Sequence, residues 1–403
     1  MNRTERPQHG GAGLNRRDII KIGAGLGAIV ATSAQTALAQ SKAVFKASDV
    51  QPPGYPTVVA TENLGKKLAA ATNGRLSLQM FPSMQLGGEK ETIEQTQIGA
   101  IQMLRVSAGS IGPIVDDINV VNMPFLFKNM AHAERMIDGP LGQELLDKIT
   151  ASPNAGLVAL CWMNSGARSL YNTKHSIKTI ADVKGLKFRV IGNPIFIDMM
   201  NALGGNGVAM GYDQVFSALQ TGVIDGAENN PPSYVFSNHY TAAKHFSLTE
   251  HLIVPELLVF SKRAWSALSA DDQTLIRKLA REAQMEERGL WNIYEQQAME
   301  KAKAAGCEIV EIADKHELFA NPRHPYTQAL LASVPIADPK AKRSAPLIDG
   351  DVPSPINPPP GCAFHTRCRY AIDRCRTERP GLQATGARHQ VACWLNDGTG
   401  RDE

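Results

Sequence analysis

The sequence lacks several features that would assign it a class at once. Its 403 residues carry a formal net charge of only +3, which gives no general case for nucleic-acid binding. No Walker A string, GxxxxGK[ST], occurs, so ATP hydrolysis by this chain is excluded. No apolar run reaches the ~20 residues that a membrane-spanning helix needs. What is present is 43% hydrophobic residues, enough to bury the cores of two or three domains.

The first 39 residues have the order of an export signal. The pair Arg16-Arg17 precedes the apolar run IGAGLGAIVATSA, and Ala37-Leu38-Ala39 supplies small residues before Gln40. A run of roughly 13 apolar residues is too short to span a bilayer, which favours cleavage and release. We therefore expect residues 1–39 to be a twin-arginine or general secretory signal and the mature chain to be periplasmic.

After the signal, short apolar runs alternate with helical patterns. AVFKAS, LSLQMFP and LKFRV read as strands, whereas ENLGKKLAAATNG and KETIEQTQIGAIQM read as helices. Ser269 followed by two aspartates predicts the start of a helix of about 35 residues that runs to about 305. Such a helix, ~50 Å long, exceeds one small domain, so we expect an α/β fold in which it braces two lobes.

Several ordered strings carry a family resemblance. TNGRLSLQMFPSMQLGGEKETIEQTQIGAIQM, NMPFLFKN, DVKGLKFRV and ALQTGVIDGAENN resemble the periplasmic solute-binding subunits (DctP-type) of tripartite ATP-independent periplasmic (TRAP) transporters, over about 40–306. The resemblance implies a two-lobed periplasmic binding protein fold and a receptor that hands a small organic acid to two membrane permease subunits. It places lobe 1 at about 40–165 and 254–290, lobe 2 at about 166–253, and the bridging helix at about 270–305.

The resemblance also implies a binding site. In the strand LKFRV, Arg189 shares a face with Lys187 and points away from the apolar side. The family position it occupies forms the salt bridge to the substrate carboxylate, a role that suits a planar guanidinium. Further expected substrate-binding residues are Arg168, Asn229, Glu228, Glu89, Ser107, Phe125, Trp162, Tyr171 and Tyr234. The stretch MGYDQ departs from the family's usual proline-containing segment, which affects the expected shape of the pocket.

The resemblance implies a C4-dicarboxylate or a sugar acid such as a hexuronate as the ligand, and one short segment favours the second. ARSLYN resembles receptors for sugar acids such as hexuronates more than receptors for sialic acid or C4-dicarboxylates. We expect neither a cofactor nor catalysis in this part, because residues 40–306 show no nucleophile–base pair or metal-ligand spacing.

The chain changes character after about residue 309. The strings HELFANPRHPYTQALLASVP and INPPPGCAFHTRCRYAIDRC are similar to the C-terminal extension of oligopeptide and dipeptide ABC transporter ATPases. We therefore expect a small irregular extension over 307–403 with a proline-rich linker. This tail suggests an alternative function as an accessory of peptide ABC transport, or a misassembled fusion in which only the receptor part functions.

The tail holds four of the six cysteines. The resemblance implies that Cys362, Cys368, Cys375 and Cys393 can ligate an iron–sulfur cluster, since thiolates are the ligands that such centres require. In an oxidising compartment the same residues could instead form two disulfides or remain free thiols.

Overall fold

The computed structural model describes residues 42–311, 321–333, 359–386 and 389–396. The expected export signal and most of the proline-rich linker lie outside these ranges. Within them, no helix is both long and apolar enough to cross a membrane.

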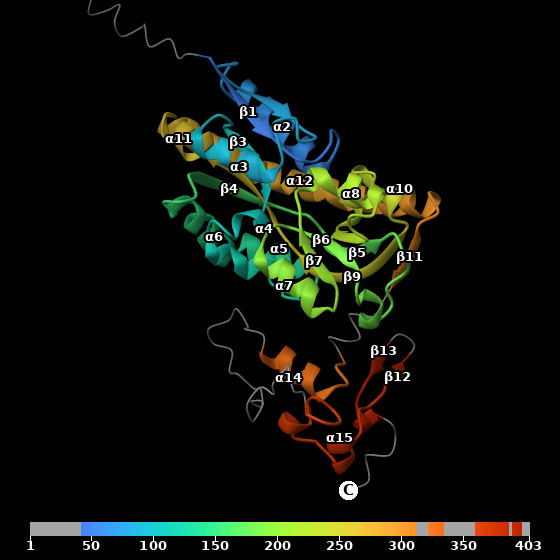
Figure 1. Ribbon diagram of the computed structural model, residues 1–403. Helices are drawn as coiled ribbons and strands as arrows, with labels where there is room; N and C mark the ends of the chain where they lie inside the picture. Colours follow the sequence, from blue (N-terminus) through green and yellow to red (C-terminus); the bar gives the residue numbers. More distant parts are fainter. Residues whose placement is uncertain (1–41, 312–320, 334–358, 387–388, 397–403) are drawn as a thin grey trace, which may run out of the picture.

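Two mixed sheets divide the first 270 described residues into two halves (Figure 1). The five-stranded sheet of lobe 1 has the order β2-β1-β3-β10-β4. Its strands are β1 (Ala43–Ser48), β2 (Leu76–Phe81), β3 (Met103–Ser107), β4 (Leu157–Met163) and β10 (Glu256–Ser261). Strand β10 runs antiparallel to β3 and β4, whereas β1, β2 and β3 are parallel.

The six-stranded sheet of lobe 2 has the order β11-β9-β5-β8-β6-β7. Its strands are β5 (Ala167–Asn172), β6 (Lys187–Val190), β7 (Asn206–Ala209), β8 (Gly226–Asn229), β9 (His245–Ile253) and β11 (Glu308–Glu311). The chain crosses between the sheets at 164–166 and again at 254–255. At the first crossing Gly166 has φ +61°, and a Cβ there would lie 3.0 Å from the Trp291 ring, so glycine fits this turn.

Helices and short 3-10 turns cover both sheets. Those of lobe 1 are α2 (Pro56–Ala71), α3 (Glu89–Ile98), α4 (Ala108–Ile111), η1 (Asp116–Asn122), α5 (Met130–Asp138), α6 (Pro140–Ala151) and α11 (Lys262–Trp265). Those of lobe 2 are η2 (Ile180–Val183), α7 (Pro194–Ala202), η3 (Tyr212–Gln214), α8 (Val215–Thr221), α9 (Pro231–Phe236) and α10 (His239–Ala242).

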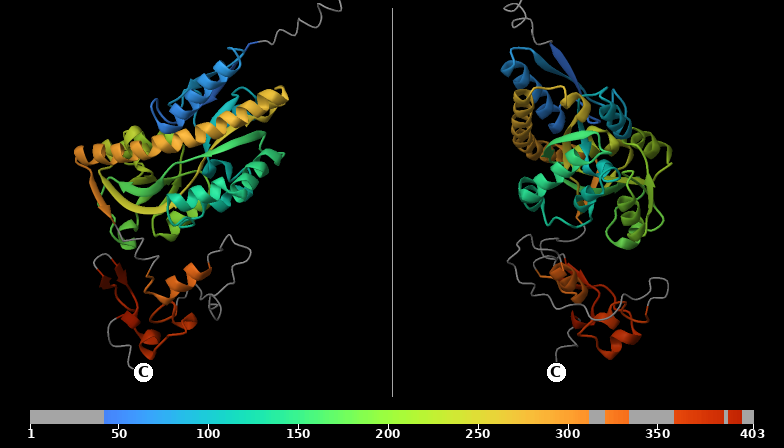
Figure 2. Two further views of the ribbon diagram at one scale, coloured as in Figure 1. Left: turned by 180° about the vertical axis from the view of Figure 1, so that it is seen from behind. Right: turned by 90° about the vertical axis from the view of Figure 1, so that its left-hand side faces the viewer.

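Helix α12 (Ala270–Ala304) confirms the predicted long helix and braces both halves (Figure 2). Ser269 caps it by accepting a hydrogen bond from the Asp272 amide, as its sequence predicts. The helix packs on α2 and β4 of lobe 1 and on α9 of lobe 2. Its buried side chains join separate cores along its length, from Ile276 in lobe 1 to Ala298 in lobe 2. It therefore ties the two lobes into one unit.

The strand after this helix corrects the expected domain boundary. We expected the extension to begin at 307, but β11 pairs in parallel with β9 and forms the edge of the lobe 2 sheet. Cys307 and Ile309 pack into the lobe 2 core. The receptor fold therefore extends through residue 311, because the sheet is completed by that strand.

The described parts of the tail pack on one another. They are α14 (Pro325–Ser333), η4 (His365–Arg367), α15 (Asp373–Thr377), β12 (Gln383–Gly386), β13 (His389–Val391) and η5 (Trp394–Asn396). The rings of His324 and Tyr326 contact Phe364, and Asn396 donates a hydrogen bond to the Arg323 carbonyl. The extension is therefore a small module with little regular structure, as expected.

Candidate functional site

Arg189 is a buried cation without a buried counter-ion. It lies in β6 on the face opposite to Phe188 and Val190, because side chains alternate along a strand, and 5% of its surface is exposed. Its Nε donates to the Met210 carbonyl at 2.9 Å, and its guanidinium lies 5.6 Å from the centre of the Tyr212 ring. Among the described residues no carboxylate comes within ion-pair distance of it, and its two terminal nitrogens have no partner. Burial lowers the pKa of Arg189; the more distant Glu228 carboxylate opposes this effect and the positive charge of Arg168 adds to it.

Arg168, by contrast, is already neutralised. Its Nε and Nη2 donate to the two carboxylate oxygens of Glu228 at 2.5 and 2.8 Å, and Nη1 donates to Asn229 Oδ1 at 3.0 Å. The antiparallel pairing of β5 with β8 brings these residues together. Burial opposes the charge of Arg168, but the Glu228 carboxylate raises its pKa above the usual value. A ligand anion therefore has more to gain at Arg189 than at Arg168.

A buried histidine, which the sequence analysis did not name as a site residue, lies next to the Arg168–Glu228 ion pair. His251 is 2% exposed, and its Nε2 lies 3.9 Å from the Glu228 carboxylate without a hydrogen-bond partner. Burial lowers the pKa of His251 to about 4, so the ring is neutral at pH 7. Its signal in the sequence was weak, because a lone histidine in a strand is ordinarily a core or surface residue.

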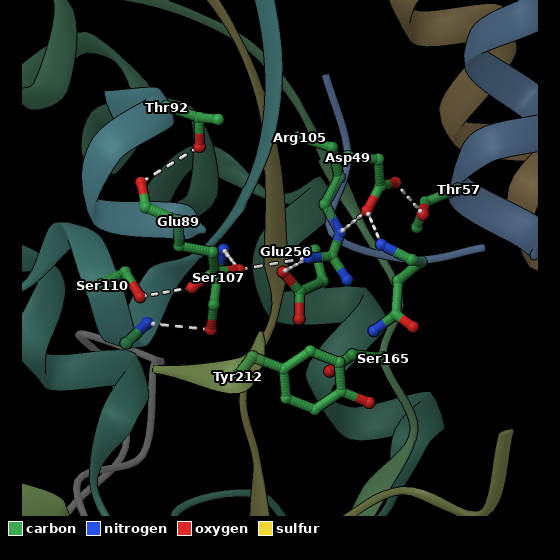
Figure 3. Close-up of polar contacts among 12 residues, drawn as sticks. Asp49, Thr57, Glu89, Thr92, Arg105, Ser107, Ser110, Ser165, Tyr212 and Glu256 are labelled. Atoms are coloured by element: carbon green, nitrogen blue, oxygen red, sulfur yellow. Dashed lines mark hydrogen bonds and ion pairs between the residues drawn. The ribbon is translucent and has the colours of Figure 1, made fainter. Parts of the chain in front are cut away.

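Lobe 1 contributes a second buried group, the Arg105 cluster, formed by Arg105, Asp49, Glu89 and Glu256 (Figure 3). The guanidinium of Arg105 lies 3.6 Å from Asp49, 3.2 Å from Glu89 and 3.4 Å from Glu256. Burial raises the pKa of Glu256 to about 7 even though Arg105 opposes the shift, and burial also raises the pKa of Asp49. The guanidinium of Arg105 is thus the shared ion-pair partner of three carboxylates.

The Glu89 carboxylate accepts two hydrogen bonds from groups outside this cluster. Its Oε1 accepts from the Ser107 amide at 3.2 Å, and its Oε2 accepts from the Ser110 hydroxyl at 2.5 Å (Figure 3). The first turn of α3 places it there, and its side chain is 17% exposed. The structure thus joins Glu89 and Ser107, two residues that the sequence had named separately.

Tyr212 lies against Arg189, at the point where the two lobes approach one another. Its ring faces Arg189, its hydroxyl is 2.6 Å from Ser237 Oγ, and Figure 3 draws it in the same view as the Arg105 cluster. A Cβ built on Gly88 would lie 3.5 Å from Asp213 Oδ1. The residue before Glu89 and the residue after Tyr212 therefore approach one another from the two lobes. MGYDQ was noted as unusual in the sequence, but Tyr212 was not named as a site residue.

Direct hydrogen bonds also join the lobes. The Tyr55 hydroxyl lies 2.9 Å from Ser233 Oγ, and Asn193 Nδ2 donates to the Gly109 carbonyl at 3.0 Å and to Asn119 Oδ1 at 2.9 Å. Each bond runs between a lobe 1 residue and a lobe 2 residue. The two lobes are therefore closed on one another.

Two expected site residues belong to hydrophobic cores instead. Trp162 has no exposed surface and donates from Nε1 to the Gly142 carbonyl at 3.0 Å. Tyr234 is 1% exposed and donates to the Ala243 carbonyl at 2.6 Å. Apolar neighbours enclose these two rings and backbone groups accept hydrogen bonds from their polar atoms, so the structure places them in the cores, and their contact with a ligand stays a prediction.

The other two aromatic candidates lie in different surroundings. Tyr171 is buried in the lobe 2 core, and its hydroxyl is 2.7 Å from His239 Nδ1. Phe125 is 55% exposed on the loop after η1, where its amide donates to the His251 carbonyl. Tyr171 therefore acts as a core residue, and Phe125 is a surface residue near one end of β9.

The four tail cysteines line one small cavity, with a volume of about 10 Å³. All four are free thiols, and the Cys362 amide donates to the Cys375 carbonyl at 2.8 Å. Burial raises the pKa of Cys368 and Cys393, and the neighbouring thiols add to the shift. The donor set suits a cation, although the part of the chain that the structure describes holds no three such ligands already at metal-binding geometry.

The fold is that of a two-lobed solute receptor. It has two α/β lobes, two short crossings between them, a helix that braces both, and a buried arginine without a counter-ion. The chain belongs to the bacterial extracellular solute-binding proteins, family 7 (DctP), whose model matches residues 47–327. A second model, the oligopeptide/dipeptide transporter C-terminal region, matches residues 310–375. The first match passes beyond 306, in agreement with the place of β11 in the receptor sheet.

Solved structures and a curated relative agree with this assignment. A TRAP periplasmic solute-binding protein from Pseudomonas putida F1 with bound D-glucuronate is 52% identical, with a TM-score of 0.67 over 72% of this chain and 92% of that one. A second, from Citrobacter koseri with bound D-glucuronate, is 44% identical, with a TM-score of 0.67 over 73% of this chain and 100% of that one. The apo, open structure of the Citrobacter koseri protein has a TM-score of 0.61 over 72% of this chain and 97% of that one. A solute-binding protein of Chromohalobacter salexigens is 40% identical over 78% of this chain and 92% of its own length.

Proposed function

We propose that this protein is a receptor for hexuronates such as D-glucuronate and that Arg189 binds the carboxylate of the sugar acid. The observation that carries the proposal is the buried guanidinium of Arg189, which has two free terminal nitrogens and no counter-ion among the described residues. A carboxylate matches two parallel N–H donors and would compensate the buried charge. The 52% identical relative that holds D-glucuronate supports the choice of a sugar acid over a C4-dicarboxylate.

The neighbouring groups have supporting roles in this proposal. The ion pair with Glu228 fixes the Arg168 side chain. The positive charge of Arg168 repels that of Arg189, so an anion bound at Arg189 relieves this repulsion. Asn229 uses its oxygen for Arg168, and its amide nitrogen remains free to donate to a ligand oxygen. Closure of the lobes around the sugar acid excludes water and strengthens the salt bridge.

The receptor delivers its ligand to the small and large membrane subunits of a TRAP transporter and performs no catalysis. Its membership in the solute-binding family supports this step. We place it in the periplasm, where a twin-arginine or general secretory signal in residues 1–39 would export it. Neither nucleic acid nor ATP is a partner.

Isothermal titration of the purified protein with D-glucuronate, D-galacturonate and succinate tests the proposal. We expect the uronates to bind and Arg189→Ala and Arg189→Lys to weaken binding at least about 100-fold, since removing a buried charged partner costs several kcal/mol. Lys187→Ala is the matched control, because Lys187 lies exposed at the start of the same strand. Unchanged uronate affinity in both Arg189 variants would refute the role of this residue.

For the tail, we propose that Cys362, Cys368, Cys375 and Cys393 hold an iron–sulfur cluster. The support is that all four line one cavity and that each thiolate disfavours the others until a cation offsets their charge. A bound cluster would cross-link the four parts of the tail that carry these cysteines. Export in the folded state through a twin-arginine signal would allow insertion before export.

Iron and sulfide analysis, a visible absorbance spectrum and thiol counting test the tail proposal. Iron with sulfide and a visible band that Cys375→Ser abolishes would support it. Two disulfides by mass spectrometry, or four reactive thiols without iron, would overturn it.

A further inference from the structure

The binding site has opposite charges on its two sides. In lobe 2, Arg168 and Arg189 face one carboxylate, Glu228, which leaves one positive charge in excess. In lobe 1, the Arg105 cluster has three carboxylates for one guanidinium, which leaves two negative charges in excess. If Glu256 takes a proton, one negative charge still remains. A ligand between the lobes therefore meets a cation at one end and anions at the other.

Glu89 is the carboxylate of the cluster best placed to meet a ligand. Asp49 is fully buried and Glu256 is 4% exposed, whereas the Glu89 side chain retains 17% exposure. Three donors already occupy it: Arg105, the Ser107 amide and the Ser110 hydroxyl. A carboxylate has about four lone-pair sites, so one remains for a ligand donor. The Ser110 hydroxyl donates its hydrogen to Glu89, so its oxygen can only accept a further hydrogen bond from a ligand.

One buried charged residue in each lobe has hydrogen-bonding capacity that the protein does not use. Arg189 is 5% exposed with free terminal nitrogens on the lobe 2 side. Glu256 Oε2 is buried without a hydrogen-bond donor on the lobe 1 side. The nearest positively charged group to Glu256 Oε2 is the Arg105 guanidinium, 3.4 Å away, which it shares with Asp49 and Glu89.

We propose that Glu89 is a specificity-determining residue that makes this receptor select acids with a single carboxylate and reject dicarboxylates. The inference rests on the proposed function and deepens it. The carboxylate of a uronate binds Arg189, and its far hydroxyls donate to Glu89. A second carboxylate at that end would have no hydrogen to donate and would lie against the excess negative charge of the Arg105 cluster.

D-glucuronate and D-glucarate serve as the two probes. They share a six-carbon chain with the same hydroxyl configuration, but C1 is a second carboxylate in glucarate, which stays an open chain whereas glucuronate closes to a ring. The change in their affinity ratio between the wild type and Glu89→Gln therefore carries the test, because the ring difference is the same in both proteins. Titration calorimetry at pH 7.5 should show glucuronate binding at least about 100-fold more tightly, because facing like charges cost several kcal/mol. Glu89→Gln should bind glucarate about ten-fold more tightly than the wild type does and reduce the discrimination accordingly. Glu94→Gln, the same change on an exposed position of α3, should leave both affinities unchanged.

The outcomes separate the two proposals. Equal affinity of the wild type for glucuronate and glucarate would overturn the role of Glu89 and leave the receptor function intact. Binding of neither acid would overturn the hexuronate function and, with it, this inference. Should Glu89→Gln fail to fold, Ser110→Ala provides the second test. It frees a Glu89 lone pair without changing charge, so discrimination against glucarate must persist, and its loss would refute the charge argument.

Discussion

Glu287 in α12 allows a quantitative prediction about stability and pH. It is fully buried, and its Oε2 accepts a hydrogen bond from the Asn164 amide at 2.9 Å, at the first crossing between the lobes. Its Oε1 has no partner. Burial raises the pKa of Glu287 from 4.5 to about 8, although the Asn164 amide and the charge of Arg288 act in the opposite direction. At pH 7 the folded protein therefore holds a proton here that the unfolded chain releases.

The sign follows from this proton balance. For an acid whose pKa is raised by folding, the stabilising contribution is complete below pH 4.5 and is lost as the pH rises through about 8. Each unit in this window lowers the free energy of unfolding by about 1.4 kcal/mol, which amounts to about 3 kcal/mol between pH 4.5 and 7. Glutamine keeps an oxygen for the Asn164 amide and has no such dependence. We expect Glu287→Gln to be about 2–3 kcal/mol more stable than the wild type at pH 7 and nearly equal to it near pH 4.5.

Urea unfolding of the ligand-free protein at pH 5, 6, 7 and 8 measures this difference. Burial raises the pKa of Glu256 to about 7, which gives a slope of the same sign in both proteins, so the difference between them reports Glu287 together with its coupling to the Glu256 charge. Glu300→Gln, at an exposed position of the same helix, is the control and should run parallel to the wild type. Parallel curves for the wild type and Glu287→Gln from pH 5 to 8 would show that the buried carboxyl does not hold the proton.

Three further predictions concern the lobes and the tail. Glu228→Gln should lower the free energy of unfolding by about 3–5 kcal/mol in chemical denaturation, because Arg168 then lies buried without its ion pair; an unchanged midpoint would contradict this. Asn193→Asp keeps the acceptor that caps α7 but loses the amide donor between the lobes, so ligand-free protein should be more open by X-ray scattering and bind uronate about ten-fold more weakly. A chain ending at 315 should melt like the full chain, whereas one ending at 306 should melt at a lower temperature because β11 is missing; equal melting of the two shortened chains would show that the strand adds no stability.

Much of the fold could be predicted because its signals are local. The strands 43–48 and 76–81 and the helix that starts after Ser269 were visible as apolar periodicity and a capping residue. The end of the receptor was harder to predict. Strand β11 has only four residues, and the evidence for it is its pairing with β9, which no local pattern reveals.

The site was predicted in part for a similar reason. The alternation in β6 places Arg189 on the polar face, but the absence of a counter-ion there depends on residues far away in the sequence. The Arg105 cluster combines residues from β3, α3, β10 and the end of β1, and none of these segments alone indicates an ionic group. The sequence did not indicate that Trp162 and Tyr234 lie in hydrophobic cores, because an aromatic residue fits a core as well as a pocket.

The edge position of β11 decides which half carries the rest of the chain. The long helix begins against lobe 1, but its last turns and the strand after it belong to lobe 2. Whatever follows residue 311 is therefore tethered to the half that bears Arg189, and it travels with that half when the receptor opens. A fluorescent label placed just after this strand, paired with one on α2, would report opening as a change in the separation between the dyes.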